Sequence, residues 1–299
     1  MKYLFQDQDL FKSAIELASK ESKIPPSLIE KDYYVTLLLK KLNESIQGLL
    51  FKGGTCCSKA FGIINRFSED IDLTLDEEHY SSKYKRNANH MIIDVCDDLC
   101  LPILNREFVI KNSHSNFNRY IIEYPIIFET NSLKSYVQIE MVYMEKAYPK
   151  EIKSINSILG KYLKDDNVND ALTPFNISVQ SLKRTFVDKV FAICDYYLNN
   201  TSTRISRHIY DLYMIFPAID FSEDFVSFIS KIRFERSKNM KCLSAKNDIN
   251  ISDVLLKSYS SNYFEKDFNE TTSMILFDDV EYKTCKEVLK DIANMHIFD

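Results

Sequence analysis

The stretch that decides the fold is Phe51-Lys-Gly-Gly-Thr-Cys-Cys-Ser-Lys-Ala-Phe-Gly-Ile-Ile-Asn-Arg-Phe-Ser-Glu-Asp-Ile-Asp-Leu-Thr-Leu-Asp76. An apolar segment, 49–51, leads into the glycine pair Gly53-Gly54. The whole chain has only five glycines, so two adjacent ones mark a tight turn where a ligand can approach the backbone. A helix is expected at 57–64, and a turn that leads into a helix presents backbone N–H groups to an anion such as a phosphate.

Two aspartates follow in a segment with the pattern of a β-strand. Residues two apart in a strand point to the same side, so Asp70 and Asp72 share a face while Ile71 and Leu73 point into a core. Two carboxylates ~4 Å apart repel by about 4 kcal/mol at an effective dielectric constant of about 20, and a divalent cation turns that cost into a binding site. Mg²⁺ takes one or two carboxylates together with substrate phosphates. Either half of the stretch alone is better explained as a turn or a polar strand face, but together they predict phosphoryl or nucleotidyl transfer.

The order Gly-Gly, short helix, Asp-hydrophobic-Asp resembles the nucleotidyltransferase superfamily. Three segments, Lys52-Gly-Gly-Thr55, Ser58-Lys59-Ala60 and Arg66-Phe-Ser-Glu-Asp-Ile-Asp-Leu73, more closely resemble the AbiEii family. These are the nucleotidyltransferase-like toxins of abortive-infection (type IV) toxin–antitoxin systems, related to the MenT toxins. The resemblance implies an α+β fold, with a nucleotidyltransferase-like core in which helices flank a small mixed β-sheet, followed by a mainly helical C-terminal lobe.

The resemblance also implies roles for individual residues. Asp70 and Asp72 would hold Mg²⁺ or Mn²⁺ against a nucleoside triphosphate, the NTP substrate. The superfamily often supplies a third carboxylate from the neighbouring strand, and Glu140, which shares a strand face with Gln138, is the candidate metal ligand. An exposed glutamate on the sheet face is the open alternative. The residues expected to contact the nucleotide around this pair are Gly53, Gly54, Thr55, Lys59 and Ser68.

A second block, Thr185-Phe-Val-Asp-Lys189, resembles the family segment in which a helix lysine contacts the triphosphate, so this role is carried over to Lys189. Periodicity alone places Lys189 at the border of the apolar arc of helix 182–198. A lysine at such a border usually lays its stem along the core and leaves its charge in water.

A third block, 204–214, resembles the family's Arg-Asp-hydrophobic-Tyr-Asp-Leu helix. By periodicity alone, Arg207 and Asp211 form an exposed i,i+4 ion pair worth about 0.3–0.5 kcal/mol. Only the resemblance makes Asp211 a candidate catalytic residue that aligns Lys189 or the acceptor. His208 departs from the family, which commonly has aspartate at this position.

Hydrophobic patterning predicts the rest of the organisation. Helices are expected in 1–48 and at 82–101, strands at 106–111, 118–128 and 134–143, and helices from 154 onward. We expect two domains, 1–150 with the N-terminal helices and the core, and 151–299 as a helical domain contributing to the active-site cleft. The segment Glu30-Lys31-Asp32-Tyr33 also resembles the start of AbiEii-like proteins, but it is assigned no chemistry.

Composition limits the partners. The formal net charge of −5 argues against a general nucleic-acid coat, so RNA contact must come from a local patch. The seven cysteines include no C-x-x-C pair, and neither a signal peptide nor a membrane-spanning run is recognisable. We therefore expect a cytoplasmic monomer without a membrane partner. The candidate basic patch, for which a solvated helix surface is the alternative, is Lys231, Arg233, Arg236, Lys238, Lys241 and Lys246.

The resemblance implies a toxin that transfers a nucleoside monophosphate from an NTP to RNA, at the 3′ end of tRNA, and so blocks translation in phage defence. It also implies a cognate antitoxin that works without a stable complex. One alternative is a nucleotidyltransferase acting on a protein or on a small molecule such as an aminoglycoside. The other is a non-catalytic nucleotide- or RNA-binding protein. A calcium site at Asp70-Ile-Asp72 lacks the oxygen ligands and bidentate Glu of an EF-hand loop.

Overall fold

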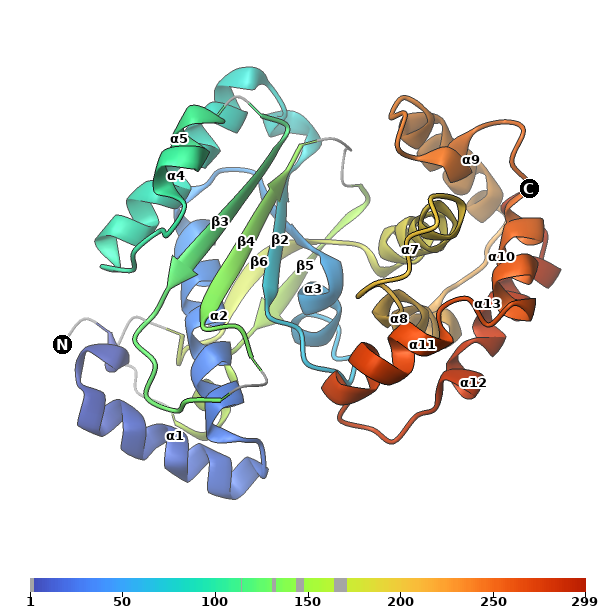
Figure 1. Cartoon of the computed structure of the whole chain (residues 1–299). Coiled ribbons are helices and arrows are strands. Elements are labelled where there is room, and N and C mark those ends of the chain that lie inside the picture. Colours follow the sequence, from blue (N-terminus) through green and yellow to red (C-terminus); the bar gives the residue numbers. More distant parts are fainter. Residues whose placement is uncertain (1–2, 114, 131–132, 144–147, 164–170) are drawn as a thin grey trace. The chain divides into compact units, whose positions relative to one another are not determined.

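The computed structural model describes residues 3–113, 115–130, 133–143, 148–163 and 171–299 (Figure 1). The chain divides into two compact units. Unit 1 comprises Met1–Ala60 and Ser68–Gln180, and unit 2 comprises Phe61–Phe67 and Ser181–Asp299. The chain therefore enters unit 2 for one short segment, 61–67. In the sequence this segment lies between the glycine pair and the two aspartates Asp70 and Asp72, here called the acid pair.

The described strands of unit 1 form one mixed sheet in the order β3-β4-β2-β1-β6-β5. Their bounds are β1 Leu49–Lys52, β2 Asp70–Leu75, β3 Phe117–Glu123, β4 Tyr136–Val142, β5 Lys150–Ile155 and β6 Phe175–Gln180. Strand β2 is antiparallel to β1 and parallel to β4, and Asp72 is the register partner of Lys52 on one side and of Glu140 on the other. The predicted α+β class, with a mixed sheet and flanking helices, is confirmed.

Helices cover this sheet within unit 1. Helix α2 packs against β2 and β4, while α1 and α4 pack against α2 (Figure 1). Leu37, Leu38 and Leu39 of α2 are fully buried, and burying one such side chain stabilises a fold by about 1.5–3 kcal/mol. The helices of unit 1 are α1 Gln8–Ser22, α2 Pro26–Ser45, α3 Gly53–Lys59, α4 Ser82–Asp98, α5 Arg106–Lys111 and α6 Ile158–Tyr162. The helices expected in 1–48 and at 82–101 are therefore confirmed.

Unit 2 is built from helices around an aromatic core. Phe186 lies 6.2 Å from both Phe225 and Phe298, measured between ring centroids. Segment 61–67 joins this unit through backbone bonds, because the Phe67 N–H donates to the Ile275 carbonyl over 2.8 Å. None of the described helices is long and apolar enough to cross a membrane. The helices are α7 Leu182–Leu198, α8 Arg207–Ile215, α9 Asp224–Ser237, α10 Ile251–Ser260, α11 Glu265–Asp267, α12 Tyr282–Cys285 and α13 Glu287–Asn294.

The strand expected at 106–111 is wrong, because these residues form helix α5. The edge of β3 is already covered by the residues just before that helix. The Leu104 N–H donates to the Ile121 carbonyl, and the Asn105 amide donates to the Arg119 carbonyl and accepts from the Ile121 N–H. With β3 satisfied in this way, 106–111 has no strand to pair with and closes into a helical turn.

The expected strand 118–128 is shorter in the structure, because β3 ends at Glu123, just before Pro125. The expectation that the chain is helical from 154 onward is also wrong for β5 and β6; residues 164–170 lie outside the described part. Strand β6 runs parallel to β1, with Phe51 opposite Val179, and β5 pairs with β6. Such pairing between distant segments leaves no local signal in the sequence.

The bounds of one further helix differ from expectation. The helix expected at 57–64 is α3, which begins at Gly53 and ends at Lys59. The first compact unit extends to Gln180, because β5 and β6 extend the sheet of unit 1. The division at 150 remains a prediction about domain organisation.

Candidate active site

The predicted site residues divide between the two units. Unit 1 holds the glycine pair, the acid pair and the residues around them, and unit 2 holds Lys189 and Asp211. Each set is a cluster within its own unit.

Gly53 and Asp72 lie against each other. Gly53 has a φ of +79°, a backbone conformation that side chains with a Cβ rarely adopt. A Cβ placed on Gly53 would lie only 1.9 Å from Oδ2 of Asp72. This contact follows from the sheet register, because Lys52 of β1 is directly opposite Asp72 of β2. Position 53 therefore accepts only glycine, and the Asp72 carboxylate is seated on its backbone.

Thr55 and Ser68 connect helix α3 to strand β2, here called the acid strand because it carries the acid pair. The Thr55 hydroxyl donates to the Asp70 carbonyl over 2.5 Å and lies 2.7 Å from the Ser68 hydroxyl. A hydroxyl has one proton to donate, so Ser68 is the donor to Thr55. Both hydroxyl protons are thus used inside the protein, and a phosphate at this turn would be met by backbone N–H groups. Thr55 is buried, so its side chain fixes the turn.

Asp70 is held in a chain of alternating charges that sequence reasoning missed. The Lys134 ammonium bonds Oδ1 of Asp70 at 2.9 Å and lies 3.5 Å from Oε1 of Glu69. Glu69 in turn accepts from the fully buried Lys31 of α2. Burial lowers the pKa of Lys31 although Glu69 opposes the shift. Burial alone would lower the pKa of Lys134, but the bond to Asp70 together with the charges of Asp70 and Glu69 outweighs burial, so this pKa is raised.

Glu140 lies beside the acid pair, on the same partly exposed face of the sheet as Asp72. Its Oε1 accepts from the Arg119 guanidinium at 3.0 Å and from the Gln138 amide at 2.9 Å. Glu140 therefore lies on the neighbouring strand, opposite Asp72, where a third carboxylate was expected. The ion pair with Arg119 gives Glu140 a structural role as well, and its metal role remains a prediction.

The acid pair fits a hard cation shared with a substrate. Asp70 and Asp72 supply two carboxylates from one strand face, the number that Mg²⁺ commonly takes from protein. Within the described residues, no group of three or more His, Cys, Asp or Glu side chains is arranged to hold a metal. The donor set suits Mg²⁺ or Mn²⁺ completed by phosphate oxygens, and it does not suit the closed four-ligand shell of structural zinc.

Lys59, expected to contact the nucleotide, bonds elsewhere. Its ammonium pairs with the Asp32 carboxylate of α2, and only 8% of its side chain is exposed. Contact with a nucleotide would require Lys59 to leave Asp32, so the geometry favours a structural role for this lysine.

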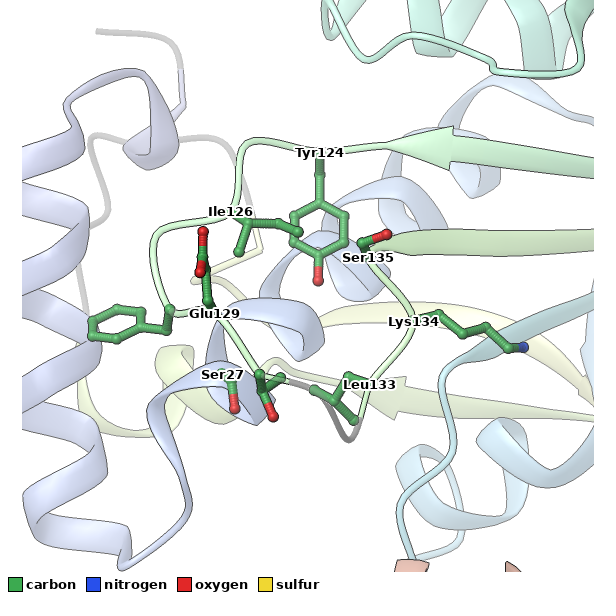
Figure 2. Close-up of a pocket in the computed structure, with 9 residues that line it drawn as sticks. Ser27, Tyr124, Ile126, Glu129, Leu133, Lys134 and Ser135 are labelled. Atoms are coloured by element: carbon green, nitrogen blue, oxygen red, sulfur yellow. The ribbon is translucent and has the colours of Figure 1, made fainter.

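A cavity of about 280 Å³ lies in unit 1 beside the acid strand (Figure 2). It is formed by the loop between β3 and β4 together with the start of α2. Figure 2 shows the Lys134 side chain extending away from Leu133 and Ser135, in keeping with its bond to Asp70. Its walls include Ser27, Tyr124, Ile126, Phe128, Leu133 and Lys134.

In unit 2, Asp211 is the centre of a buried ion cluster. Its carboxylate accepts two bonds from Arg66, at 2.7 and 2.8 Å, and one from Lys189 at 2.6 Å. Burial alone would raise the pKa of Asp211, but Arg66 and Lys189 outweigh it and hold that pKa well below its usual range. The expected exposed pair with Arg207 is therefore wrong, since Asp211 is fully buried on the inward side of α8.

Lys189 is correspondingly not a border lysine with its charge in water. It is 6% exposed, and its ammonium is held by Asp211 and lies 3.4 Å from Nδ1 of His208. Burial and the Lys189 charge lower the pKa of His208, so its imidazole is neutral at pH 7 and Nδ1 can accept from Lys189. Asp211 thus holds the Lys189 ammonium in place, and its catalytic role remains a prediction.

Arg66 also belongs to this cluster, although the sequence analysis assigned it no role. It comes from segment 61–67, and it is 3% exposed. The signal available in the sequence was its place in the segment from Arg66 to Leu73, which resembles the AbiEii family. Its partner, 145 positions away, could not be read from spacing.

The candidate RNA patch is only partly a surface. Arg236 is buried and donates to Asp195 over 3.0 Å. Arg233 donates to the carbonyls of Lys246, Ile249 and Phe298. Both arginines therefore stabilise unit 2. The exposed members of the patch are Lys231, Lys238, Lys241 and Lys246.

Comparison with protein families decides the broader assignment. The sequence matches the family described as nucleotidyl transferase AbiEii toxin, type IV TA system, over residues 37–284. The chain belongs to the AbiEii nucleotidyltransferase toxin family. This match spans the glycine pair, the acid pair, Lys189 and Asp211 of the AbiEii-family chain. No curated protein matches the sequence.

One solved structure, MenT4, agrees with the fold of this AbiEii-family protein. MenT4, a nucleotidyltransferase toxin from Mycobacterium tuberculosis, superposes with a TM-score of 0.59 at 13% identity, covering 95% of this chain and 89% of MenT4. JHP933 from Helicobacter pylori is 15% identical, with 90% and 92% of the two chains covered and a TM-score of 0.47. The likeness to MenT4 supports the nucleotidyltransferase toxin fold.

Gly53→Ala tests the seat of Asp72 in this AbiEii-family chain. The new methyl group would overlap the Asp72 carboxylate and force it to move, so we expect at least ~10-fold weaker binding of NTP, as when a group that positions a metal ligand is lost. The left-handed backbone adds about 1–2 kcal/mol of strain. Gly62→Ala is the matched control, because Gly62 has a φ of +64° and open space around its Cα. Calorimetry should show an NTP affinity close to wild type for Gly62→Ala, and equal affinities for the two variants would contradict the seat.

Proposed function

We propose that this protein transfers a nucleoside monophosphate from an NTP to RNA, at the 3′ end of tRNA, and thereby blocks translation. The observation that carries the proposal is the acid pair on one face of β2, with the Asp72 carboxylate seated on the Gly53 backbone. Family membership supports the reaction class. The tRNA acceptor rests on the kinship of the AbiEii toxins.

In the proposed reaction, Asp70 and Asp72 would hold Mg²⁺ or Mn²⁺, and a cation held there would supply positive charge to the triphosphate. The backbone from Gly53 to Thr55 holds phosphate oxygens, and Lys189 neutralises the terminal phosphates. The acceptor hydroxyl forms a bond to the α-phosphorus, and the bond to pyrophosphate breaks. The hydroxyl proton passes to one of the acid-pair carboxylates. Most of the rate enhancement then comes from positioning and charge stabilisation.

Lys134 and Asp211 have supporting parts in this proposal. If Asp70 held a cation, that cation would compete with the Lys134 ammonium for the carboxylate, and Lys134 would then be available to a phosphate oxygen. Asp211 is a poor proton acceptor, since two cations hold its pKa well below the usual range. We therefore assign to Asp211 the positioning of Lys189.

The exposed lysines Lys231, Lys238, Lys241 and Lys246 are the proposed contact to the RNA backbone. Exposed Phe234 lies in the same segment, with the Lys238 ammonium 4.6 Å from its ring centre. Cations next to an exposed aromatic ring are typical of single-stranded nucleic-acid surfaces. We further propose that the protein acts as a monomer in the cytoplasm. Its cognate antitoxin would restrain it without a stable complex.

The test is an acceptor competition. Purified protein is incubated with Mg²⁺ and each of the four labelled NTPs in turn, in the presence of total RNA, cellular protein and an aminoglycoside. We expect label on RNA of tRNA size, removable by trimming of the 3′ end. Label on protein or drug would contradict the RNA acceptor while keeping nucleotidyl transfer. Binding of NTP without any labelled product would support the non-catalytic alternative.

Lys189→Met should weaken NTP binding about 10-fold, because a cation that the triphosphate meets is lost. Asp211 keeps its two bonds to Arg66 in this variant, so stability changes less than it would on removing Asp211. Lys183→Met on the same helix is the control, since Lys183 lies over Phe225 and Phe228 rather than in the ion cluster. Calorimetry with NTP and Mg²⁺ measures the effect. Equal affinities for the two variants would make Lys189 a purely structural lysine.

A further inference from the structure

Three consecutive charged residues of helix α2, Glu30, Lys31 and Asp32, are largely withdrawn from water. Glu30 is 1% exposed, Lys31 is 0% exposed, and 14% of the Asp32 side chain is exposed. Consecutive side chains on a helix point about 100° apart, so three charges in a row would ordinarily place at least one in solvent. Burying each of them is costly unless it is paired, and each has a partner on a different segment.

Lys31 reaches the acid strand. Its ammonium donates to Glu69, the residue immediately before Asp70, and to the Lys134 carbonyl over 2.6 Å. Lys134 in turn bonds Asp70. Lys31 therefore fixes both Glu69, which precedes Asp70, and the backbone of Lys134, whose ammonium bonds Asp70.

Asp32 reaches the helix that begins at the glycine pair. Its Oδ1 accepts from Lys59, the last residue of α3, and its Oδ2 accepts from the Ile158 N–H over 2.7 Å. Since α3 begins at Gly53, this bond sets the far end of the helix whose first turn seats Asp72.

Glu30 reaches the loop after β3. Its two carboxylate oxygens accept from the N–H groups of Ile127 and Phe128, at 2.7 and 3.1 Å. Ile126, Phe128 and Lys134 all line the cavity in Figure 2. Glu30 therefore fixes one part of the wall of the cavity that Lys134 also lines.

We propose that Glu30, Lys31 and Asp32 are positioning residues. They hold strand β2, helix α3 and the cavity wall with Lys134 in the arrangement that receives the metal-bound triphosphate. This proposal rests on the proposed function of the same site. All three residues lie on one helix, α2, so the segments that they bond share one anchoring element.

Lys31→Met tests the proposal. With Lys31 removed, Glu69 draws the Lys134 ammonium to itself and away from the phosphate oxygen that it would meet, so we expect the dissociation constant for NTP with Mg²⁺ to rise about 10-fold, as when a bond to a charged group is lost. Each of the four NTPs is titrated calorimetrically, without any acceptor. The matched control is Lys40→Met, which removes a buried lysine from the same helix, where its ammonium donates to the Thr173 hydroxyl over 2.6 Å. Both variants should melt at lower temperature, but Lys40→Met should bind NTP like wild type.

A second variant separates positioning from general loss of structure. Adding Glu69→Gln to Lys31→Met removes the carboxylate that competes for Lys134, so we expect NTP affinity to return to within about threefold of wild type. Equal affinities for Lys31→Met and Lys40→Met, or no recovery in the double variant, would overturn the positioning role. If the wild-type protein transferred no nucleotide to RNA, the proposed function itself would fall, which is a distinct result.

Discussion

Asp72→Asn should reduce nucleotidyl transfer by about 10³-fold or more and remove growth inhibition on expression. The substitution keeps the shape of the side chain but removes one of the two negative charges that bind the cation on the face of β2. Loss of one preorganised charge-stabilising group typically costs ~10²–10³-fold in rate, and loss of a metal ligand adds weaker metal binding. Incorporation of labelled nucleotide into RNA measures the effect.

Stability provides the check on this variant. Asp72 neighbours Asp70 on one strand face, so removing its charge relieves repulsion, and we expect the urea midpoint to stay near that of wild type. Asp98→Asn on α4 is the matched control, because Asp98 is an exposed aspartate away from the sheet, and it should transfer nucleotide normally. A folded Asp72→Asn protein that labels RNA at the wild-type rate would exclude the metal role of the acid pair.

Asp211→Asn should have the largest effect on stability, about 3–5 kcal/mol in the free energy of unfolding. The change leaves Arg66 and Lys189 buried beside a neutral amide, and removing one partner of a buried ion pair strands the remaining charge. Urea titration followed by circular dichroism measures the loss. Asp220→Asn makes the same chemical change at an exposed position and should stay within about 0.5 kcal/mol of wild type. A small loss for Asp211→Asn would mean that the cluster contributes little to folding.

The same residue should make stability fall in acid. The pKa of Asp211 is depressed in the fold, so the unfolded chain takes up its proton first, at a pH near the ordinary aspartate value of about 3.9. The contribution of Asp211 is therefore complete above that pH and is lost as pH falls through the lower pKa of the folded state. The difference in stability between wild type and Asp211→Asn should narrow below about pH 4. A constant difference from pH 7 to pH 3 would contradict the cause assigned to the shift.

The central stretch was predictable because its signals are local. A glycine pair and an alternating Asp-Ile-Asp pattern specify a turn and a strand face through neighbouring residues alone, and the register of β1 with β2 then brings Gly53 against Asp72. The family resemblance added Lys189 to the predicted site residues. The partnership of Lys189 with Asp211 was expected only as one of two roles.

The rest depends on contacts between distant segments. Strand β6 is specified by its pairing with β1, and helix α5 forms because Leu104 and Asn105 already cover the edge of β3. Asp211 looked exposed because the periodicity of α8 does not reveal that Arg66 approaches it from another part of the chain. Lys134 was expected to begin strand 134–143, but it precedes β4, and its bond to Asp70, 64 positions away, leaves no local signal in the sequence.

The excursion of residues 61–67 has a consequence for how toxins of this kind can be recombined. A crossover that exchanged only 181–299 between two relatives would separate Arg66 from the Asp211 with which it is paired. A viable chimera must therefore inherit the short segment together with the C-terminal part, although the acid strand stands between them in the sequence. Segment 61–67 and residues 181–299 are consequently inherited as one module.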